Sequence, residues 1–288
     1  MIEIDIQKSL FGASGKTLLQ INTKIESQSF VSIFGKSGAG KTTLLRIIAG
    51  LERADCGKIV VDNEVWFDKG VNLPPQKRKI GFVFQDYALF PHFSVYQNLA
   101  FGIKDSKNKK EKIRSILATM GLEALSTKLP RHLSGGQRQR VALARALVCD
   151  AKILMLDEPL SAIDNEMRLS LQDEILRLHK DFGLTTILVS HDISEIFKLS
   201  SRILHIKNGV IISDGDINSV FGADNISAKF NFTAKIIDIE PQGIIFVIKI
   251  LVNNQISTIT LGKEAADFRV GDEVLVASKA FNPMVFKA

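Results

Sequence analysis

The sequence has few cysteines, and this shortage narrows the class of protein. Its 288 residues include two, Cys56 and Cys149. Two cysteines without the spacing of a metal site cannot build a disulfide framework, and they fit a reducing compartment where thiols stay free. The first ten residues, MIEIDIQKSL, are charged and alternating, so we expect no secretory signal segment there.

Long apolar runs are also missing. A membrane-spanning helix needs about 18 or more apolar residues in succession, and no run reaches that length. The longest candidate, GIIFVIKILV at 243–252, is interrupted by Lys249 and is rich in β-branched residues. It is therefore predicted to be a strand.

The chain is moderately basic, with a net charge of +6 and a pI of about 9.2. This balance fits an anionic ligand or an anionic membrane surface, and it equally fits a surface on which the charge has no role. Lysines gather in DSKNKKEK at 105–112, which is typical of a solvated helix start. We expect no nucleic acid partner.

Over most of its length the chain alternates short apolar runs with helical patterns, which indicates an α/β fold. Buried strands are predicted at FVSIF (30–34), ILMLD (153–157) and TTILVS (185–190). TLLRIIAG (43–50) has helical spacing and a glycine stop. SRILHIKNGVIISDG (201–215) predicts a hairpin turning at Asn-Gly. Polar residues follow the strands, where an open α/β sheet binds its ligands.

The composition changes between residues 216 and 231. Beyond this segment, short β-branched runs are punctuated by glycines and asparagines, the texture of a small all-β barrel. We predict an α/β domain at 1–227, with a helical subdomain at about 90–150, and a β-barrel domain at 228–288. The second domain is small enough to need a partner for stability.

A phosphate-binding loop is predicted at GKSGAGKT, which follows a strand and opens a helix. Its glycines let the backbone approach phosphates, and the helix start adds positive potential. Lys41 is expected to reach the β and γ phosphates of a nucleotide, and the Thr42 hydroxyl to hold Mg²⁺. The predicted nucleotide-binding residues here are Gly35, Lys36, Ser37, Gly38, Ala39, Gly40, Lys41, Thr42 and Thr43.

Two carboxylates emerge at the end of the apolar run ILMLDEP (153–159). Asp157 is expected to orient the metal, either directly or through a water. Glu158 is expected either to polarise an attacking water or to hold a substrate group. A surface salt bridge is the simpler interpretation of Glu158 taken alone.

A second glycine-rich stretch, LSGGQ at 133–137, decides between possible families. Together with the phosphate loop and ILMLDE in the same order, it makes the chain resemble the ATP-binding-cassette ATPases over roughly residues 1–222. Four further positions agree with that family: Gln85 with its Q-loop, Ser161-Ala162-Ile163-Asp164 with its D-loop, His191 with its switch histidine, and Phe11 with the aromatic that stacks on adenine.

The resemblance implies that two copies meet head to tail and sandwich ATP. The signature residues of one copy would cap the γ-phosphate held by Lys41 of the other, and these residues are Ser134, Gly135, Gly136 and Gln137. Glu158 would polarise the water, and His191 would bond the γ-phosphate. Gln85 would approach both the metal and the water.

The arrangement of the chain narrows the branch of the family. Lys41 and Ser134 are 93 positions apart, which leaves no room for the coiled coil of repair-type cassettes, and only one cassette is present. The resemblance thus implies a separate ATPase subunit, peripheral on the cytoplasmic face of the membrane. It would bind integral-membrane permease subunits and serve a substrate-binding protein indirectly. Tyr87, Leu89 and Phe90 either form the docking surface for the permease or belong to the core.

The cargo prediction rests on resemblance alone. EVWFD (64–68) and NLPPQKRKIGFVFQDYALFPH (72–92) are most similar to the ATPases of molybdate importers, and the tail resembles their molybdate-binding barrel. The tail departs from that pattern at Lys229-Phe230 and Phe281, so a purely dimerising tail is the alternative. Sulfate, ferric iron, polyamine or sugar are the alternative cargoes. A regulatory module that binds ATP without driving transport is the alternative function.

Overall fold

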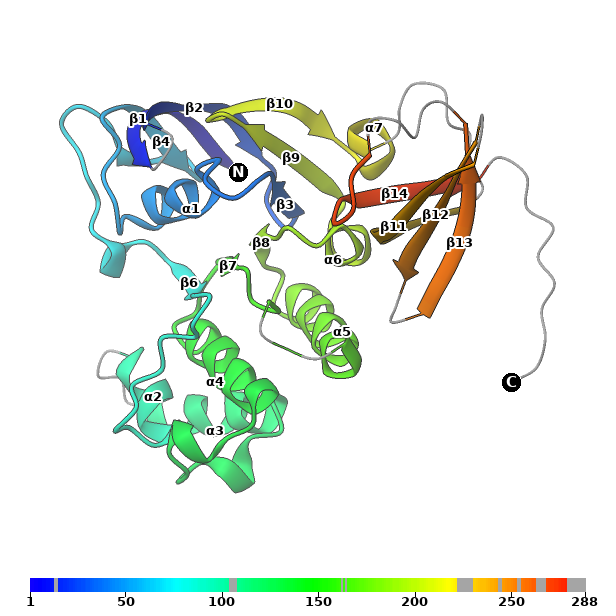
Figure 1. Ribbon diagram of the computed structural model, residues 1–288. Coiled ribbons are helices and arrows are strands. Elements are labelled where there is room, and N and C mark those ends of the chain that lie inside the picture. The colour runs from blue at the N-terminus through cyan, green and yellow to red at the C-terminus, as the bar shows by residue number, and fades with distance from the viewer. Residues whose placement is uncertain are drawn as a thin grey trace. The chain divides into compact units, whose positions relative to one another are not determined.

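The computed structural model describes residues 1–12, 15–103, 108–161, 163, 165–221, 230–242, 245–252, 255–262 and 268–278 (Figure 1). By its internal contacts the chain divides into two compact units, Met1–Val220 and Phe221–Ala288. The domain boundary predicted from the sequence, between 227 and 228, lies outside the described residues.

Unit 1 is built on one mixed sheet, which has ten strands among the described residues, in the order β5-β4-β1-β2-β10-β9-β3-β8-β7-β6. The strands are β1 (Ile2–Gly12), β2 (Gly15–Ile25), β3 (Phe30–Phe34), β4 (Cys56–Val61), β5 (Glu64–Phe67), β6 (Ile80–Val83), β7 (Ile153–Asp157), β8 (Thr185–Val189), β9 (Arg202–Lys207) and β10 (Val210–Gly215). Parallel pairings join β9, β3, β8, β7 and β6. Antiparallel pairings join β5, β4, β1 and β2.

The central parallel strands are buried on both faces. Along β7, Leu154 and Leu156 belong to one hydrophobic cluster, while Ile153 and Met155 belong to another. This split follows from the period of two along a strand, which sends neighbouring side chains to opposite faces of a sheet. The sheet therefore separates two cores, and polar side chains at its strand ends form the site.

The helices of unit 1 are α1 (Lys41–Ala49), α2 (Val95–Phe101), α3 (Lys109–Thr119), α4 (Gly135–Leu147), α5 (Asn165–Asp181) and α6 (Ile193–Leu199), and α7 (Ile217–Phe221) follows them in the chain. Three short 3₁₀ turns are described at Pro75–Lys77, Glu123–Leu125 and Pro130–His132. α1 contributes its apolar side to the cluster that contains Ile153. α2, α3 and α4 gather at one end of unit 1 (Figure 1).

Several sequence predictions for unit 1 are confirmed. The runs predicted at 30–34 and 153–157 form β3 and β7, and the run at 185–190 forms β8. The predicted hairpin forms β9 and β10, and both turn residues, Asn208 and Gly209, have positive φ, as a type I′ turn requires. The predicted helix ends at Gly50, whose left-handed backbone caps α1.

Unit 2 contains a four-stranded antiparallel sheet in the order β13-β12-β11-β14 among its described residues. The strands are β11 (Phe230–Gln242), β12 (Ile245–Val252), β13 (Gln255–Leu261) and β14 (Glu273–Ser278). Lys249, which interrupts the apolar run of β12, pairs with Asp238 at 2.8 Å and Glu240 at 3.0 Å. In its described residues the tail is antiparallel β, as the sequence predicts, while the barrel domain at 228–288 stays a prediction. Of the residues at which the tail departs from the molybdate pattern, Lys229 and Phe281 lie outside the described residues.

Among the described residues, none of the helices combines the length and apolarity that crossing a membrane requires.

Candidate functional site

The predicted phosphate loop connects β3 to α1 and is shaped by its glycines. Gly35 has φ 155°, and a Cβ there would lie 2.2 Å from the carbonyl oxygen of Ile206, so a larger residue cannot fit. Gly38 has φ 81°, a conformation that side chains disfavour, and open space lies around its missing Cβ. The backbone of this loop is therefore exposed to an incoming group.

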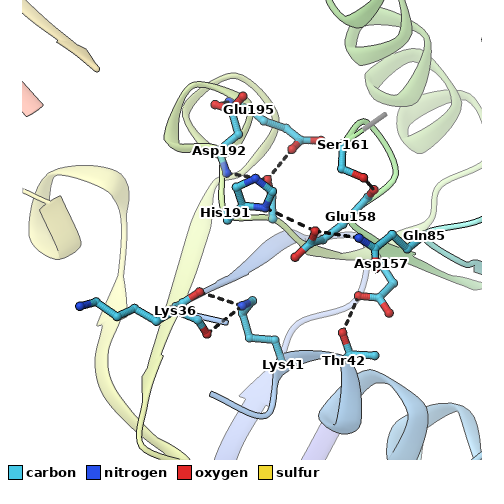
Figure 2. Close-up of polar contacts among 12 residues, drawn as sticks. Lys36, Lys41, Thr42, Gln85, Asp157, Glu158, Ser161, His191, Asp192 and Glu195 are labelled. Atoms are coloured by element: carbon cyan, nitrogen blue, oxygen red, sulfur yellow. Dashed lines mark hydrogen bonds and ion pairs between the residues drawn. The ribbon is translucent and has the colours of Figure 1, made fainter. Parts of the chain in front are cut away.

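Lys41 lies at the start of α1 with its ammonium group inside the loop (Figure 2). Its Nζ donates to the carbonyl oxygens of Gly35 at 2.7 Å and Lys36 at 3.1 Å. Burial lowers the pKa of Lys41, and the nearby carboxylates of Glu158 and Asp157 oppose that shift. A cation held in this way, beside exposed backbone N–H groups, suits a polyphosphate.

The next residue, Thr42, connects the loop to β7. Its Oγ1 donates to Oδ1 of Asp157 at 2.9 Å. Asp157 ends β7 and is buried, and this burial raises the pKa of its carboxyl group. The described residues contain no cluster of three or more His, Cys, Asp and Glu side chains that would hold a metal alone. An oxygen pair of this kind still fits Mg²⁺, which is commonly bound by one or two carboxylates together with substrate phosphates.

Glu158 lies one residue beyond β7 in a backbone conformation that is rare for its type. Its φ is 47°, which costs on the order of 1–3 kcal/mol and is found most often at functional sites. Its backbone N–H donates to the carbonyl oxygen of Val189 at 2.9 Å, which anchors it to the end of β8.

The Glu158 carboxylate lies between Gln85 and His191 (Figure 2). Its Oε2 accepts a hydrogen bond from Gln85 Nε2 at 3.3 Å and lies 3.4 Å from Nδ1 of His191. β6, β7 and β8 each end just before one of these three side chains. Gln85 and His191 therefore both contact the same carboxylate oxygen of Glu158, Oε2.

The loop that follows Gln85 is held in an unusual conformation. Tyr87 and Ala88 have φ 63° and 43°, and their carbonyl oxygens accept bonds from the Arg145 guanidinium of α4 at 2.9 and 2.6 Å. Tyr87 is buried in the core, so the interpretation of this residue as part of a docking surface is wrong. Leu89 and Phe90 are partly buried at the edge of the same region.

A cavity of about 1180 Å³ joins the phosphate loop to Gln85 and Glu158. It is lined by Ser37, Gly38, Gly40, Lys41, Thr42, Thr43, Gln85 and Glu158 from the predicted set. Phe11 also lines it, with 81% of its surface exposed. The volume lies just above the range of about 300–1,000 Å³ that is usual for ligand pockets, so the cavity has room for a nucleotide. The exposed Phe11 ring is available for stacking on its base.

Of the other predicted loop residues, Gly35 and Lys36 supply the carbonyl groups that hold Lys41, and Ala39 packs into the core. Sequence reasoning missed Lys8, Glu52 and Asp55, which line the same cavity. Asp55 accepts a bond from the N–H of Ser9 at 2.7 Å and lies 3.4 Å from the Lys8 ammonium. No motif contains them, because the pairing of β1 with β4 is what brings them together.

The signature stretch forms the start of α4. Ser134 caps this helix: its Oγ accepts from the N–H of Gln137 at 3.2 Å, while Gln137 Oε1 accepts from the N–H of Ser134 at 2.9 Å. Gly135 has open space where a side chain would be. Among the described residues, those that line the nucleotide-sized cavity include none of Ser134, Gly135, Gly136 or Gln137. The structure of one copy therefore does not bring the two predicted phosphate-binding stretches together.

Polar contacts also fix Asp192, the residue that follows His191. Asp192 caps α6 through its Oδ1, which accepts from the N–H groups of Ser194 at 2.8 Å and Glu195 at 3.3 Å. Its Oδ2 pairs with Arg168 of α5 at 3.0 Å. Asp directly before an apolar helix is a recognisable cap signal, whereas nothing in the sequence marks Arg168. In the predicted D-loop, Ser161 bonds the carbonyl oxygen of Glu158 at 3.0 Å, and Ala162 and Asp164 lie outside the described residues.

Comparisons with known proteins place the chain among transport ATPases. A family model described as ABC transporter matches residues 18–161, half of the chain. The probable sulfate/thiosulfate import ATP-binding protein of Chlorella vulgaris is 44% identical over 70% of this chain and 86% of its own length. The molybdenum import ATP-binding protein of Saccharophagus degradans is 40% identical over 73% and 58%. The spermidine/putrescine import ATP-binding protein of Haemophilus influenzae is 41% identical over 77% and 59%. The chain thus spans about three fifths of the latter two proteins.

Solved structures agree with this assignment. The dimeric structure of MJ0796, described as a bacterial ABC transporter cassette, superposes with a TM-score of 0.64 at 29% identity, covering 75% of this chain and 99% of that one. The same cassette in a dimeric post-hydrolysis state bound to ADP and Pi gives the same TM-score at 28% identity. These matches confirm the fold predicted for the first domain. The chain belongs to the ABC transporter family and is related to the ATP-binding proteins of its import systems.

Proposed function

We propose that this chain is the ATPase subunit of an importer and that it hydrolyses ATP at the site around Glu158. One observation carries the proposal: the Glu158 carboxylate lines the cavity that contains Lys41 and Thr42, and it contacts Gln85 and His191. Triphosphate hydrolysis needs these groups together, namely a cation for the phosphates, oxygen donors for a metal and a carboxylate near the attacking water.

Each side chain has a defined task in this reaction. The Lys41 ammonium and the loop N–H groups bind the β and γ phosphates, while Phe11 stacks on the base. The Glu158 carboxylate orients a water for attack on the γ-phosphorus, and His191 donates a hydrogen bond to the γ-phosphate. Gln85 contacts the same carboxylate and so couples its loop to the presence of the nucleotide. Thr42, Asp157 and Gln85 would hold Mg²⁺, which would supply charge neutralisation on the phosphates.

The active form in this proposal is a head-to-tail dimer. The signature residues Ser134 to Gln137 lie at the start of α4, apart from the cavity of their own copy. A second copy in antiparallel orientation brings its Ser134, Gly135 and Gly136 to the γ-phosphate that Lys41 holds. ATP then favours the closed pair because it contacts both copies only in that state. The dimeric cassette structures that resemble this chain support the arrangement.

The subunit is proposed to work with integral-membrane permease subunits on the cytoplasmic face of the membrane. In the segment after Gln85, three aromatic rings form a cluster: Phe90 lies 5.2 Å from Phe93 and 4.5 Å from Phe101 between ring centroids. Phe101 is 64% exposed and Phe93 37%. This cluster, in place of Tyr87, supplies the apolar surface for the permease.

For the cargo, we propose an oxyanion, with molybdate as the first candidate. The tail sequence supports molybdate by its resemblance, and the relatives reported above include sulfate/thiosulfate and molybdenum importers. A polyamine is the main alternative, since a spermidine/putrescine importer is similarly related. Unit 2 is proposed either to bind the oxyanion or to join two copies.

The catalytic assignment is tested by Glu158→Gln, which removes the charge and retains the shape. We expect phosphate release from ATP to fall about 100-fold or more, because a positioned acid–base group contributes that much, while affinity for ATP persists. The matched control is Glu123→Gln in an exposed turn, which should hydrolyse ATP at the wild-type rate. If the wild-type chain itself bound ATP but released no phosphate, the alternative function, a regulatory module that binds ATP without driving transport, would be supported instead.

The cargo is tested by ATPase stimulation of the chain assembled with its permease and binding protein. Molybdate and tungstate should each raise the ATPase rate. Sulfate should raise it as well if the importer accepts oxyanions in general, and should leave it unchanged if the importer is specific for molybdate. Stimulation by spermidine alone would overturn the oxyanion proposal while leaving the ATPase assignment intact.

A further inference from the structure

A small cavity of about 50 Å³ lies behind the catalytic groups, at the start of α6. It is bounded by Glu158 and His191 of the proposed site, and by Arg168, Ser190, Asp192 and Glu195. The last four side chains take no direct part in the proposed reaction. Glu195 is thus an acidic residue that lines this cavity without a direct task in the proposed reaction.

Glu195 is buried, with 4% of its surface exposed. One carboxylate oxygen, Oε2, accepts a hydrogen bond from the hydroxyl of Ser190. The other, Oε1, has no hydrogen-bond partner among the described residues, and the same holds for Nε of Arg168, which lines the same cavity. A buried carboxyl group with a free oxygen is costly, so its presence calls for a role beyond packing.

Ser190 connects this carboxylate to the switch segment. Its Oγ donates to Glu195 and also accepts from the N–H of Asp192 at 3.0 Å. Asp192 is itself fixed by its cap on α6 and by Arg168. Both neighbours of His191 in the chain are thus held by one network, whereas the His191 ring is 59% exposed and faces Glu158 at 3.4 Å.

We propose that Glu195 is a positioning residue for ATP hydrolysis, acting through Ser190 to hold the His191 ring against Glu158. The inference rests on the proposed function, since it assigns His191 and Glu158 their tasks. Glu195 touches neither nucleotide nor water in this arrangement. It sets the conformation of the segment 190–192 from within the core.

The proposal implies control by protonation. Burial, opposed by the Ser190 hydrogen bond, raises the pKa of Glu195 to about 7; Asp192 raises it further, and Arg168 and His191 lower it. Glu158 is the remaining charged group that lines the cavity. Above that pKa the ionised carboxylate accepts a hydrogen bond from the Ser190 hydroxyl. Below it the carboxyl group carries a proton of its own, which weakens it as the acceptor of that bond. The contribution of Glu195 is therefore present at pH 8 and lost as the pH falls through about 7.

The test compares kcat between pH 6 and 8 for the wild type, Glu195→Gln and Ser190→Ala. Gln imitates the protonated acid, so the kcat ratio of wild type to E195Q should be about tenfold at pH 8 and approach one at pH 6. KM for ATP should stay within about twofold, because the phosphate loop is untouched. Glu174→Gln is the matched control, since it removes a carboxylate paired with Arg140 outside the site and should retain the wild-type profile.

A double mutant separates positioning from general destabilisation. If Glu195 acts through Ser190, the kcat of the E195Q/S190A chain should be no lower than that of the slower single variant, since both substitutions remove the same connection. Additive losses, or an E195Q profile that parallels the wild type at every pH, would overturn the proposal.

A second measurement does not depend on hydrolysis. In chains labelled with ¹³C at the histidine ring Cε1, the His191 signal is identified among the five histidines by its loss in His191→Gln. At pH 8 this signal should be displaced from its wild-type position in both E195Q and S190A, and the displacement in E195Q should disappear at pH 6. If the displacement is present in a chain that does not hydrolyse ATP, the connection stands and the proposed function fails. If hydrolysis is normal and E195Q leaves the signal in its wild-type position at pH 8, the positioning role fails.

Discussion

At the scale of single residues, the site combines strained backbone with buried charge. Glu158, Tyr87 and Ala88 have positive φ although none of them is glycine, and Lys41 and Asp157 are buried charged groups. Each of these features costs free energy. They persist because neighbouring groups hold them: Val189 bonds the Glu158 backbone, and Arg145 bonds the carbonyl groups of the other two. Part of the strained backbone and buried charge of the molecule thus lies where the chemistry is proposed.

Thr42→Val tests the proposed metal-binding pair. Valine keeps the shape of threonine but removes the hydroxyl that bonds Asp157 at 2.9 Å, so we expect Mg²⁺ to lose its effect on ATP affinity, with kcat/KM falling about 100-fold or more. Titration calorimetry of ATP binding, with and without Mg²⁺, checks this. Thr42→Ser retains the hydroxyl and should stay within several-fold of the wild type. Full Mg²⁺ dependence in the valine variant would remove Thr42 from the proposed site.

The site residues that could be predicted lie in short sequence motifs, whereas those that were missed are brought together only by tertiary packing. Lys41, Asp157 and His191 lie at ends of strands or starts of helices within short motifs, so their neighbours along the chain mark them. Glu195 and Arg168 come from α6 and α5, and nothing local shows that they share a cavity. Their relation depends on tertiary packing, which one sequence does not display.

At the scale of elements, the helix that carries the phosphate loop is fixed at both ends. α1 begins at Lys41 in the loop and ends against the buried guanidinium of Arg78. This group donates five hydrogen bonds: to the carbonyl oxygens of Ile47, Ile48, Leu73 and Trp66 and to Oδ1 of Asn72. Two of these acceptors, Ile47 and Ile48, belong to the last turn of α1, where carbonyl groups have no donor further along the helix; the Ile47 carbonyl also accepts from the N–H of Gly50 at 3.0 Å. Burial lowers the pKa of Arg78 to about 10, so it remains charged at neutral pH.

Arg78→Met is therefore expected to lower the free energy of unfolding by about 3 kcal/mol, because it removes five hydrogen bonds and takes from the carbonyl groups of Ile48 and Leu73 the donor that Arg78 supplies. Urea unfolding followed by tryptophan fluorescence measures this, since Trp66 is the single tryptophan and lies beside Arg78. The exposed neighbour Lys77→Met should change the value by no more than about 0.5 kcal/mol. Equal effects of the two substitutions would contradict the capping role.

Element prediction succeeded where local chemistry and tertiary packing favour the same structure. β3 and β7 are short and fully apolar, and the ends of α1 and of the β9–β10 hairpin carry glycine signals. The tail differs, because its four strands follow from the alternation of its sequence but its closure into a barrel does not. Closure requires the two edge strands, β13 and β14, to pair with each other or with a further strand. In the described residues β13 pairs with β12 and β14 pairs with β11. Strand existence is local information, whereas closure is not.

At the scale of the whole molecule, the proposed dimer requires that one copy contain halves of two different sites. The cavity of unit 1 has the phosphate loop and the Glu158 carboxylate, and the signature stretch lies elsewhere, capped at the start of α4. Gly135 has open space at its Cα and so leaves the helix start accessible. Such a division is useful only if another copy completes the site, because a single chain then cannot close over its ligand.

The dimer is tested with hydrolysis disabled. With ATP and Mg²⁺, the Glu158→Gln chain should sediment at about twice the monomer mass of 31.8 kDa, because uncleaved nucleotide keeps the two copies joined. Adding Ser134→Arg should abolish this dimer, since a bulky side chain at the signature blocks the facing phosphate. Ser115→Arg on the exposed side of α3 is the matched control and should still dimerise. A Glu158→Gln chain that stays monomeric with ATP, or one that dimerises despite arginine at 134, would show that the signature does not complete the site of a second copy.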